Sequence, residues 1–219
     1  MKVCEICHGG CCRRYNPDIT GIDMIKIAES LKVDINFFAT ALPVDEQTAA
    51  ISHGKKPIFI FTDDNITRYY RFALKMEESL LFPGSYRCIF LNEFDAKKQE
   101  SKVYDNIIAR CGIYHIRPYT CRTFPVEFNP ETKQTYVIDP HELFPDDEEP
   151  AYKLCPRPVQ RDDYREFQAE MIKTIVAKEY EKQFFLQLSE KWNQNPDSSD
   201  YFIDFMKREY QNRIEHRTE

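Results

Sequence analysis

Cysteine placement constrains this chain more than any other feature of its sequence. Four cysteines lie within the first twelve residues, MKVCEICHGGCC, and eight lie in the whole chain. Six of the eight adjoin glycine, proline, arginine or another cysteine, which is typical of loops. A single free cysteine is often just a small buried side chain and would indicate little. So dense a group predicts a chain that is either crosslinked by disulfides or held together by metal.

Composition favours metal over disulfides. Of the 219 residues, 30% are charged, and the mean hydropathy is -0.59, which indicates a soluble protein. The first residues contain no apolar stretch typical of a signal peptide, and the longest apolar run, residues 58–61, is far too short to span a bilayer. We therefore expect a cytoplasmic protein, because the reducing cytosol favours metal or redox chemistry over disulfides.

The charge balance does not indicate a nucleic-acid partner. The net charge is -6 and the isoelectric point lies near 5.5, whereas nucleic-acid-binding domains usually carry a basic patch. Arg13 and Arg14 form a local basic pair, which we expect to be solvated surface. A protein partner is compatible with this composition, and its identity is unknown.

The first part of the chain predicts short helices and strands. A helix is expected after Thr20, which can form a capping box with Asp23. Its buried stripe is expected to comprise Met24, Ile27, Ala28 and Leu31. A second short helix is expected from Asp34 until Pro43. Aromatic and β-branched runs predict strands at residues 58–62, 65–74 and 86–91, and a hairpin formed by residues 124–128 and 134–139.

The C-terminal part predicts two long helices. Residues 161–192 contain no glycine or proline, and apolar residues recur there at every fourth position. This expected buried ridge comprises Ile172, Val176, Tyr180, Phe184, Leu188 and Trp192. The same spacing recurs in a last helix at Phe202, Met206, Tyr210 and Ile214. We expect an intramolecular helical hairpin, with binding of a partner helix as the alternative.

These patterns predict an α+β fold. We expect a small irregular antiparallel sheet with short helices around a cysteine metal site, together with a C-terminal helical hairpin. The change of character after residue 156 predicts a cysteine-cluster domain at residues 1–158 and a helical extension packed on it at residues 159–219.

The N-terminal thiols have the spacing of a chelating turn. Cys4 and Cys7 form a Cys-x-x-Cys pair, and Gly9 and Gly10 let the backbone fold back toward the cysteines that follow. We expect the adjacent side chains of Cys11 and Cys12 to diverge, so that both do not occupy corners of one compact site. One of them ligates while the other is buried, or the two bind different metals, or they form a vicinal disulfide. Zinc and iron–sulfur clusters both accept all-cysteine sites, so the ligand type does not choose between them.

The remaining thiols lie in distinctive surroundings and carry a resemblance. Residues 88–91 read CIFL, residues 111–125 read CGIYHIRPYTCRTFP, and a late cysteine, Cys155, is followed by proline. With the N-terminal group, these segments resemble the YkgJ-like cysteine-cluster family of the CxxCxxCC type, over about residues 1–156. The residues that match its second motif are Cys111, Tyr114, Arg117, Pro118, Cys121, Arg122, Phe124 and Pro125. The resemblance implies a domain that chelates zinc or iron.

The chain departs from that family in two places. Three residues separate Cys7 from Cys11, where the family usually has two. This spacing leaves open which of Cys11 and Cys12 binds the metal. Residues 92–110 resemble an insertion, because the family joins the flanking elements by a short turn. This insertion is polar and rich in lysine, and we expect it to loop outward.

Several other side chains are candidates for supporting roles around the metal. Arg117 and Arg122 could bind an anion or stabilise thiolates, and the favoured interpretation is that they hold the ligand loop through carboxylates such as Asp139 and Glu142 or through backbone carbonyls. Tyr114 is expected to pack beside the site, where a hydroxyl near a metal can also transfer protons. The histidines nearest to cysteines, His8 and His115, are expected to be surface residues or to support the ligands.

The predicted metal ligands are therefore cysteines from distant parts of the sequence. The candidate set comprises Cys4, Cys7, Cys11, Cys12, Cys88, Cys111, Cys121 and Cys155. Cys88 lies in an apolar strand and is the likeliest of them to be merely buried, although the family resemblance counts against this. The N-terminal thiols are expected to be joined in one site by cysteines more than a hundred residues away.

Three functions fit this site. The first is a metal-binding protein with one or two all-cysteine sites, holding zinc or an iron–sulfur cluster, whose role is to bind a partner. The second is an iron–sulfur or iron-dependent enzyme that modifies proteins or small molecules, by analogy with the related cysteine cluster of flagellin lysine methylases. The third is a metal carrier or a redox sensor.

Overall fold

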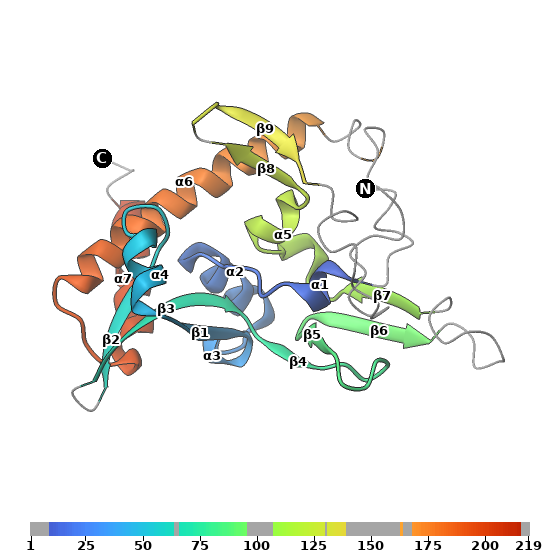
Figure 1. The fold of residues 1–219 in the computed structure, drawn as a ribbon, viewed down its shortest axis with the longest axis horizontal. Coiled ribbons are helices and arrows are strands. Elements are labelled where there is room, and N and C mark those ends of the chain that lie inside the picture. The colour runs from blue at the N-terminus through green and yellow to red at the C-terminus, as the bar shows by residue number, and fades with distance from the viewer. Residues whose placement is uncertain are drawn as a thin grey trace. The chain divides into compact units, whose positions relative to one another are not determined.

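The computed structural model describes residues 9–63, 66–95, 107–129, 131–138, 163 and 168–215 of the chain (Figure 1). It is an α+β structure of small antiparallel sheets and short helices, with a pair of C-terminal helices, as the sequence predicted. The chain forms two compact units, each made of two separate segments. Unit 1 comprises residues 1–17 and 74–175, and unit 2 comprises residues 18–73 and 176–219. The predicted division at residue 158 stays a prediction, because the described residues do not include that region.

Unit 2 is built on a three-stranded sheet with the order β1-β3-β2. Its strands are β1 (Ala39–Val44), β2 (Phe59–Asp63) and β3 (Ile66–Leu74), and β2 and β3 are antiparallel. Its helices are α2 (Gly21–Leu31), α3 (Ile35–Phe38), α4 (Glu46–Ser52), most of α6 (Gln168–Asn193), and α7 (Ser199–Glu215).

Helix α2 begins as predicted. The carboxylate of Asp23 accepts hydrogen bonds from the backbone N–H of Thr20 at 3.0 Å and from its hydroxyl at 2.8 Å. Met24 and Ile27 are fully buried, but Ala28 is half-buried and Leu31 is exposed, so the buried stripe is shorter than expected.

The second predicted helix is half the expected length. Asp34 caps α3 by accepting a hydrogen bond from Asn36 N at 2.7 Å, but the helix ends at Phe38 and the chain continues as strand β1. Pro43 lies within this strand, which is tolerated because β1 is at an edge of the sheet. Pairing with β3 therefore overrides the local helical preference. Helix α4, capped by Asp45, was not predicted.

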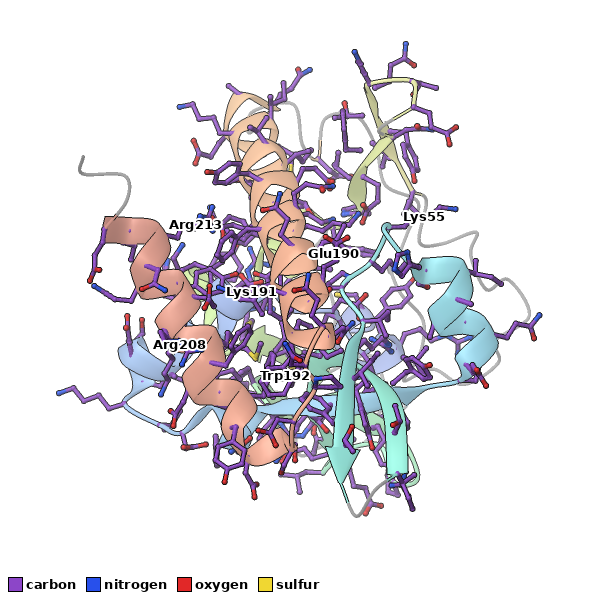
Figure 2. The ribbon with its side chains drawn as sticks, turned by 90° about the vertical axis from the view of Figure 1, so that its left-hand side faces the viewer. Lys55, Glu190, Lys191, Trp192, Arg208 and Arg213 are labelled. Atoms are coloured by element: carbon purple, nitrogen blue, oxygen red, sulfur yellow. The ribbon has the colours of Figure 1, made fainter. Side chains whose placement is uncertain are left out.

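An aromatic core joins the sheet of unit 2 to its C-terminal helices. Phe202 of α7 stacks on Phe72 of β3 with ring centroids 4.7 Å apart, and it contacts Phe59 of β2 at 4.8 Å. Phe185 of α6 contacts Phe59 at 4.9 Å. The indole N–H of Trp192, near the end of α6, donates a hydrogen bond to the carbonyl of Ile60 at 2.6 Å (Figure 2).

Ion pairs join the two C-terminal helices. Arg213 of α7 makes two hydrogen bonds to the Glu181 carboxylate of α6, at 2.7 and 3.0 Å, and Lys191 contacts Glu209 at 2.7 Å (Figure 2). The predicted helical hairpin is thus present in the structure. Among the described residues, none of the helices combines the length and apolar character that crossing a bilayer requires.

The predicted ridge on α6 is wrong in its N-terminal half. Ile172, Val176 and Tyr180 are exposed, at 48, 64 and 52%. A spacing of four residues rotates by about 40° per step on a helix of 3.6 residues per turn, so a ridge of six such positions turns about 200° around the helix. The buried face instead follows a mixed spacing of three and four residues, through Phe185, Leu188 and Trp192. In α7, Ile214 is exposed while the other three predicted positions are buried.

The described residues of unit 1 include three two-stranded antiparallel hairpins and three short helical segments. The hairpins pair β4 (Met76–Glu78) with β5 (Tyr86–Cys88), β6 (Leu91–Asp95) with β7 (Ile107–Cys111), and β8 (Val126–Asn129) with β9 (Gln134–Val137). The helical segments are α1 (Cys11–Arg14), the 3-10 helix Tyr114–Ile116 and α5 (Tyr119–Thr123). The start of α6 also belongs to this unit.

Two predictions in unit 1 need correction and one is confirmed. The hairpin β8-β9 is present, as predicted. The expected single strand at residues 86–91 is two strands, β5 and β6, separated at Ile89 and Phe90. The ends of the expected outward loop at residues 92–110 are not loop but the paired strands β6 and β7, and its middle lies outside the described residues.

Gly21, the first residue of α2, packs closely against α7, and its substitution tests the packing of unit 2. A Cβ atom at this position would lie 2.4 Å from Cε2 of Tyr210 and 2.9 Å from Sδ of Met206. We expect Gly21→Ala to lower the free energy of unfolding by about 1–3 kcal/mol, the usual cost of overpacking, although alanine is the better helix former. Chemical denaturation measures this change. Ser30→Ala, at an exposed position of the same helix, is the control and should change stability by less than about 0.5 kcal/mol.

Candidate metal centre

Helix α1 presents two adjacent thiols. Its first turn is closed by hydrogen bonds from Cys12 N to the carbonyl of Gly9 at 2.9 Å and from Arg13 N to the carbonyl of Gly10 at 3.0 Å. Gly9 has a φ of +82°, and a Cβ atom there would lie 2.9 Å from the side chain of Leu91 in β6. Glycine is therefore required at this position, because the backbone is left-handed and lies against the β6-β7 hairpin. Figure 1 shows α1 beside β5 and β7.

The thiols of Cys11 and Cys12 do not diverge, which corrects the sequence-based expectation. Their sulfur atoms are 3.9 Å apart, close enough for a hydrogen bond between them. The expectation assumed an extended backbone, on which neighbouring side chains point to opposite sides. In the short helical turn the two thiols stay on adjacent sides. Two sulfurs on one tetrahedral zinc ion lie about 3.8 Å apart when each Zn–S bond is about 2.3 Å. The pair can therefore occupy two corners of one site.

Strand ends position the next two thiols. Cys88 is the last residue of β5 and pairs with Met76, and Cys111 is the last residue of β7 and pairs with Leu91. Ile89 N donates a hydrogen bond to the carbonyl of Lys75 at 3.1 Å, which holds the backbone directly after Cys88. The N–H of Gly112 donates to the carbonyl of Phe90 at 2.7 Å, which ties the residue after Cys111 to the link between β5 and β6. Cys88 is buried, as expected, but it lies beside other thiols and not only among apolar side chains.

Cys121 lies in helix α5, which begins directly after the buried Pro118. The ring of Phe124, at the end of this helix, contacts the ring of Tyr15 edge-on, with centroids 5.5 Å apart. Tyr15 immediately follows α1, so this aromatic contact holds the Cys121 helix close to the helix that carries Cys11 and Cys12.

The five thiols are near enough to interact electrostatically. Burial raises the pKa of Cys88 to about 12, and the charges of Cys111 and Cys11 add to this effect. Burial also raises the pKa of Cys121, with Cys88 and Cys11 as further causes. Four elements of unit 1 therefore bring their thiols into one neighbourhood.

The remaining three thiols are also hard to ionise. The hydrogen bond with Cys12 and burial raise the pKa of Cys11. The pKa of Cys12 is lowered by its hydrogen bond with Cys11, but burial and the thiols around it raise it by more. Burial raises the pKa of Cys111. The described cysteines form no disulfide, so at neutral pH the group is a set of buried and half-buried thiols that a metal ion would deprotonate.

Arg117 is a cation whose charge acts on several of these thiols. Its positive charge lowers the pKa of Cys11, Cys111 and Cys121 against the effect of burial. Its Nε donates a hydrogen bond to the carbonyl of Tyr114 at 3.1 Å, and its guanidinium lies 3.9 Å from the centre of the Tyr114 ring. Arg122 lies over the ring of Tyr119 at 5.5 Å. The carboxylates considered as partners, Asp139 and Glu142, lie outside the described residues.

Arg13 is not the solvated surface residue that the sequence suggested. It is only 2% exposed, and its guanidinium is paired with Glu93 and lies 4.5 Å from the centre of the Phe82 ring. Sequence reasoning also missed Glu93 and Arg87. One signal was available: side chains two apart in a strand share a face, so Glu93 lies on the same face as the buried Leu91.

Three candidate ligands, Cys4, Cys7 and Cys155, lie outside the described residues, and so does His8. Across the described ranges, no group of three or more His, Cys, Asp or Glu residues is arranged closely enough to hold a metal ion. The donor chemistry nevertheless fits zinc or iron, because both metals bind cysteine sulfur. The distance between the sulfurs of Cys11 and Cys12 is also that expected for two ligands of one metal ion. His115 is exposed and stacks edge-on against Tyr114, as expected of a surface residue.

Comparison with known proteins supports the same chemistry. No curated protein and no solved structure matches the chain. A family model described as "CxxCxxCC: Putative zinc- or iron-chelating domain" matches residues 3–142, which is more than half of the 219 residues. This range includes seven of the eight cysteines, all except Cys155. The chain belongs to the CxxCxxCC family of zinc- or iron-chelating domains.

Proposed function

We propose that this protein binds zinc or an iron–sulfur cluster in an all-cysteine centre that joins its N-terminal segment to the β5, β7 and α5 elements. The observation that carries the proposal is the 3.9 Å approach of the sulfurs of Cys11 and Cys12, within a group of five thiols from four elements whose charges act on one another. The Cys4–Cys7 pair would complete the ligand set, because it is close in sequence to Gly9, which itself lies against the β6-β7 hairpin. Cys155 is a further candidate ligand.

The centre would be assembled as the metal binds. Among the described residues the thiols do not form a complete ligand set, and the N-terminal pair of Cys4 and Cys7 would supply further ligands. The ligands come from separate segments, which are near one another only in the folded protein. Metal binding and folding of unit 1 are therefore coupled. A structural role of this kind suits a protein whose activity is to bind a partner, and no partner is identified by these residues.

The supporting residues act on the same centre. Arg117, which already opposes the effect of burial on three thiols, would stabilise the thiolate charge once metal is bound. Tyr114 holds the guanidinium in place through its ring and its carbonyl oxygen. Arg122 would have an indirect role, because its described contact is with Tyr119.

The raised thiol pKa values weigh against the redox-sensor alternative. Sensor cysteines react as thiolates and are usually accessible, with a pKa below the ordinary value. The pKa values of the described thiols are raised instead, mainly by burial and by the neighbouring thiols. A cytosolic location remains our inference from the composition of the sequence.

Metal analysis of the protein purified without oxygen tests the proposal. We expect either about one or two zinc ions per chain and no colour, or iron with sulfide and the brown colour of an iron–sulfur cluster. Elemental analysis and the visible spectrum give the result. A protein that stays metal-free after expression with added zinc or iron, and after reconstitution under reducing conditions, would contradict the proposed function.

A further inference from the structure

One buried carboxylate lies at the centre of a polar network beside the thiols. The Glu93 side chain is 1% exposed, and the Arg13 side chain that pairs with it is completely buried. Ser79 donates a hydrogen bond from Oγ to Oε1 of Glu93 at 2.7 Å, and Leu80 N donates to Oε2 at 3.0 Å. Nε of Arg87 lies 3.4 Å from Oε2. Both oxygens of the carboxylate therefore have partners from more than one element.

The partners of Glu93 are the immediate neighbours of the thiols. Arg13 directly follows Cys12 in α1, and Arg87 directly precedes Cys88 in β5. Glu93 itself is two residues along β6 from Leu91, which pairs with Cys111. The Glu93 side chain thus connects α1 with β5, and its own strand β6 is paired with β7, which carries Cys111.

The loop between β4 and β5 is part of the same network. Arg13 donates a hydrogen bond to Ser79 Oγ at 3.1 Å, and that oxygen also accepts one from Phe82 N at 3.0 Å. The Phe82 ring lies beneath the Arg13 guanidinium. The Arg87 guanidinium also donates a hydrogen bond to the carbonyl of Leu91. These contacts give α1 one fixed position against β5 and β6.

Charge and burial make this arrangement specific. Burial raises the pKa of Glu93, but hydrogen bonds from Ser79 and Arg13 lower it by more, so the group is a carboxylate at neutral pH. A buried ion pair contributes little net stability, but removal of one partner leaves a buried charge without compensation. The network therefore favours the observed placement of the elements that it joins.

We propose that Glu93 is a positioning residue for the metal centre, which holds Cys12, Cys88 and Cys111 in the relative placement that metal binding requires. This inference rests on the proposed function. Glu93 touches no thiol in the described contacts and acts through Arg13 and Arg87. Residues that orient metal ligands in this way typically change metal affinity by about 10–100-fold when replaced.

The test compares two carboxylates that contact the same arginine. Glu93→Gln keeps the shape of the side chain but removes the charge and replaces one accepting oxygen with an amide nitrogen that donates. Glu77→Gln is the matched control, because Glu77 also pairs with Arg87, at 2.5 Å, but its side chain is 43% exposed. Cobalt(II) is the probe, and affinity is measured by competition with a chelator, while the visible spectrum of the bound cobalt reports the geometry of its thiolate ligands. Thermal melting of each variant is recorded alongside.

We expect Glu93→Gln to weaken cobalt binding by about 10–100-fold and to change the spectrum of the cobalt that remains bound. Glu77→Gln should change the affinity by less than about threefold, because exposed ion pairs contribute little. A purely structural role for Glu93 would lower the melting temperature without changing the spectrum of the bound metal. Wild-type affinity and an unchanged spectrum in Glu93→Gln would overturn the inference.

Ser79→Ala decides the question if Glu93→Gln does not fold. It removes one hydrogen bond to the carboxylate and leaves both charges in place, and we expect a smaller loss of cobalt affinity in the same direction. Unchanged affinity in that variant would overturn the inference. In the metal-free protein, the positioning role also predicts faster reaction of the thiols with Ellman's reagent in the Glu93 and Ser79 variants than in Glu77→Gln. The proposed function fails separately, through a wild-type protein that binds no metal.

Discussion

Cys121→Ser is expected to abolish stoichiometric metal binding and to lower the thermal stability of the protein. Cys121 lies in α5, and its thiol interacts electrostatically with those of Cys88, Cys11 and Cys111, so it lies within the group from which the centre would form. Loss of one ligand from a structural metal site removes much of the folding free energy that the metal supplies, several kcal/mol of a total of about 10–16 kcal/mol. Metal analysis and thermal melting of the purified variant measure both effects.

Cys88→Ser separates the two roles that Cys88 can have. If Cys88 is a ligand, its variant should lose metal as Cys121→Ser does. If it is only a buried thiol, the variant should keep its metal and lose stability alone, because a hydroxyl is less favourable than a thiol in an apolar site. Unchanged metal stoichiometry and melting in Cys121→Ser and in Cys4→Ser would exclude a centre shared between the N-terminal segment and α5.

Phe202→Ala is expected to have a comparable effect on stability but none on metal content. Phe202 is almost fully buried and contacts Phe59, Phe72 and Trp192. Truncation of such a side chain creates a cavity and costs about 3–5 kcal/mol. Trp192 is the only tryptophan, so its fluorescence reports unfolding of unit 2 directly.

Tyr201→Ala, at the neighbouring but exposed position, is the control and should change stability by less than about 0.5 kcal/mol. All the candidate metal ligands belong to unit 1, so a loss of metal in Phe202→Ala would contradict the assignment of the aromatic core and the thiol group to different units.

Features specified by neighbouring residues could be predicted from the sequence. The capping box of Thr20 and Asp23 needs only four residues, and the hairpin β8-β9 needs only a turn between two strand-like segments. The family motif also made Cys111 and Cys121 candidate ligands, because its residues are close together in the chain, and their role as ligands stays a prediction.

Features that depend on distant partners were missed. The strand conformation of residues 39–44 depends on pairing with β3, and the exposed half of the α6 ridge depends on which side of the helix meets the aromatic core. Glu93 and Arg13 are 80 positions apart, and nothing local to either shows that they pair. The close approach of Cys11 and Cys12 depends on a helical turn that Gly9 starts with a left-handed backbone.

The alternation of the two units along the chain has a consequence for dissecting the protein. The chain passes from one unit to the other after residues 17, 73 and 175, so no single cut yields two complete pieces. A cut at residue 158 would leave β2 and β3 in one fragment and remove Phe185, Trp192 and Phe202, the side chains that cover their aromatic residues. To remove unit 2, residues 18–73 would have to be excised together with residues 176–219. During synthesis, the first segment of unit 2 follows the N-terminal thiols of unit 1, and unit 2 is completed only when α7 emerges.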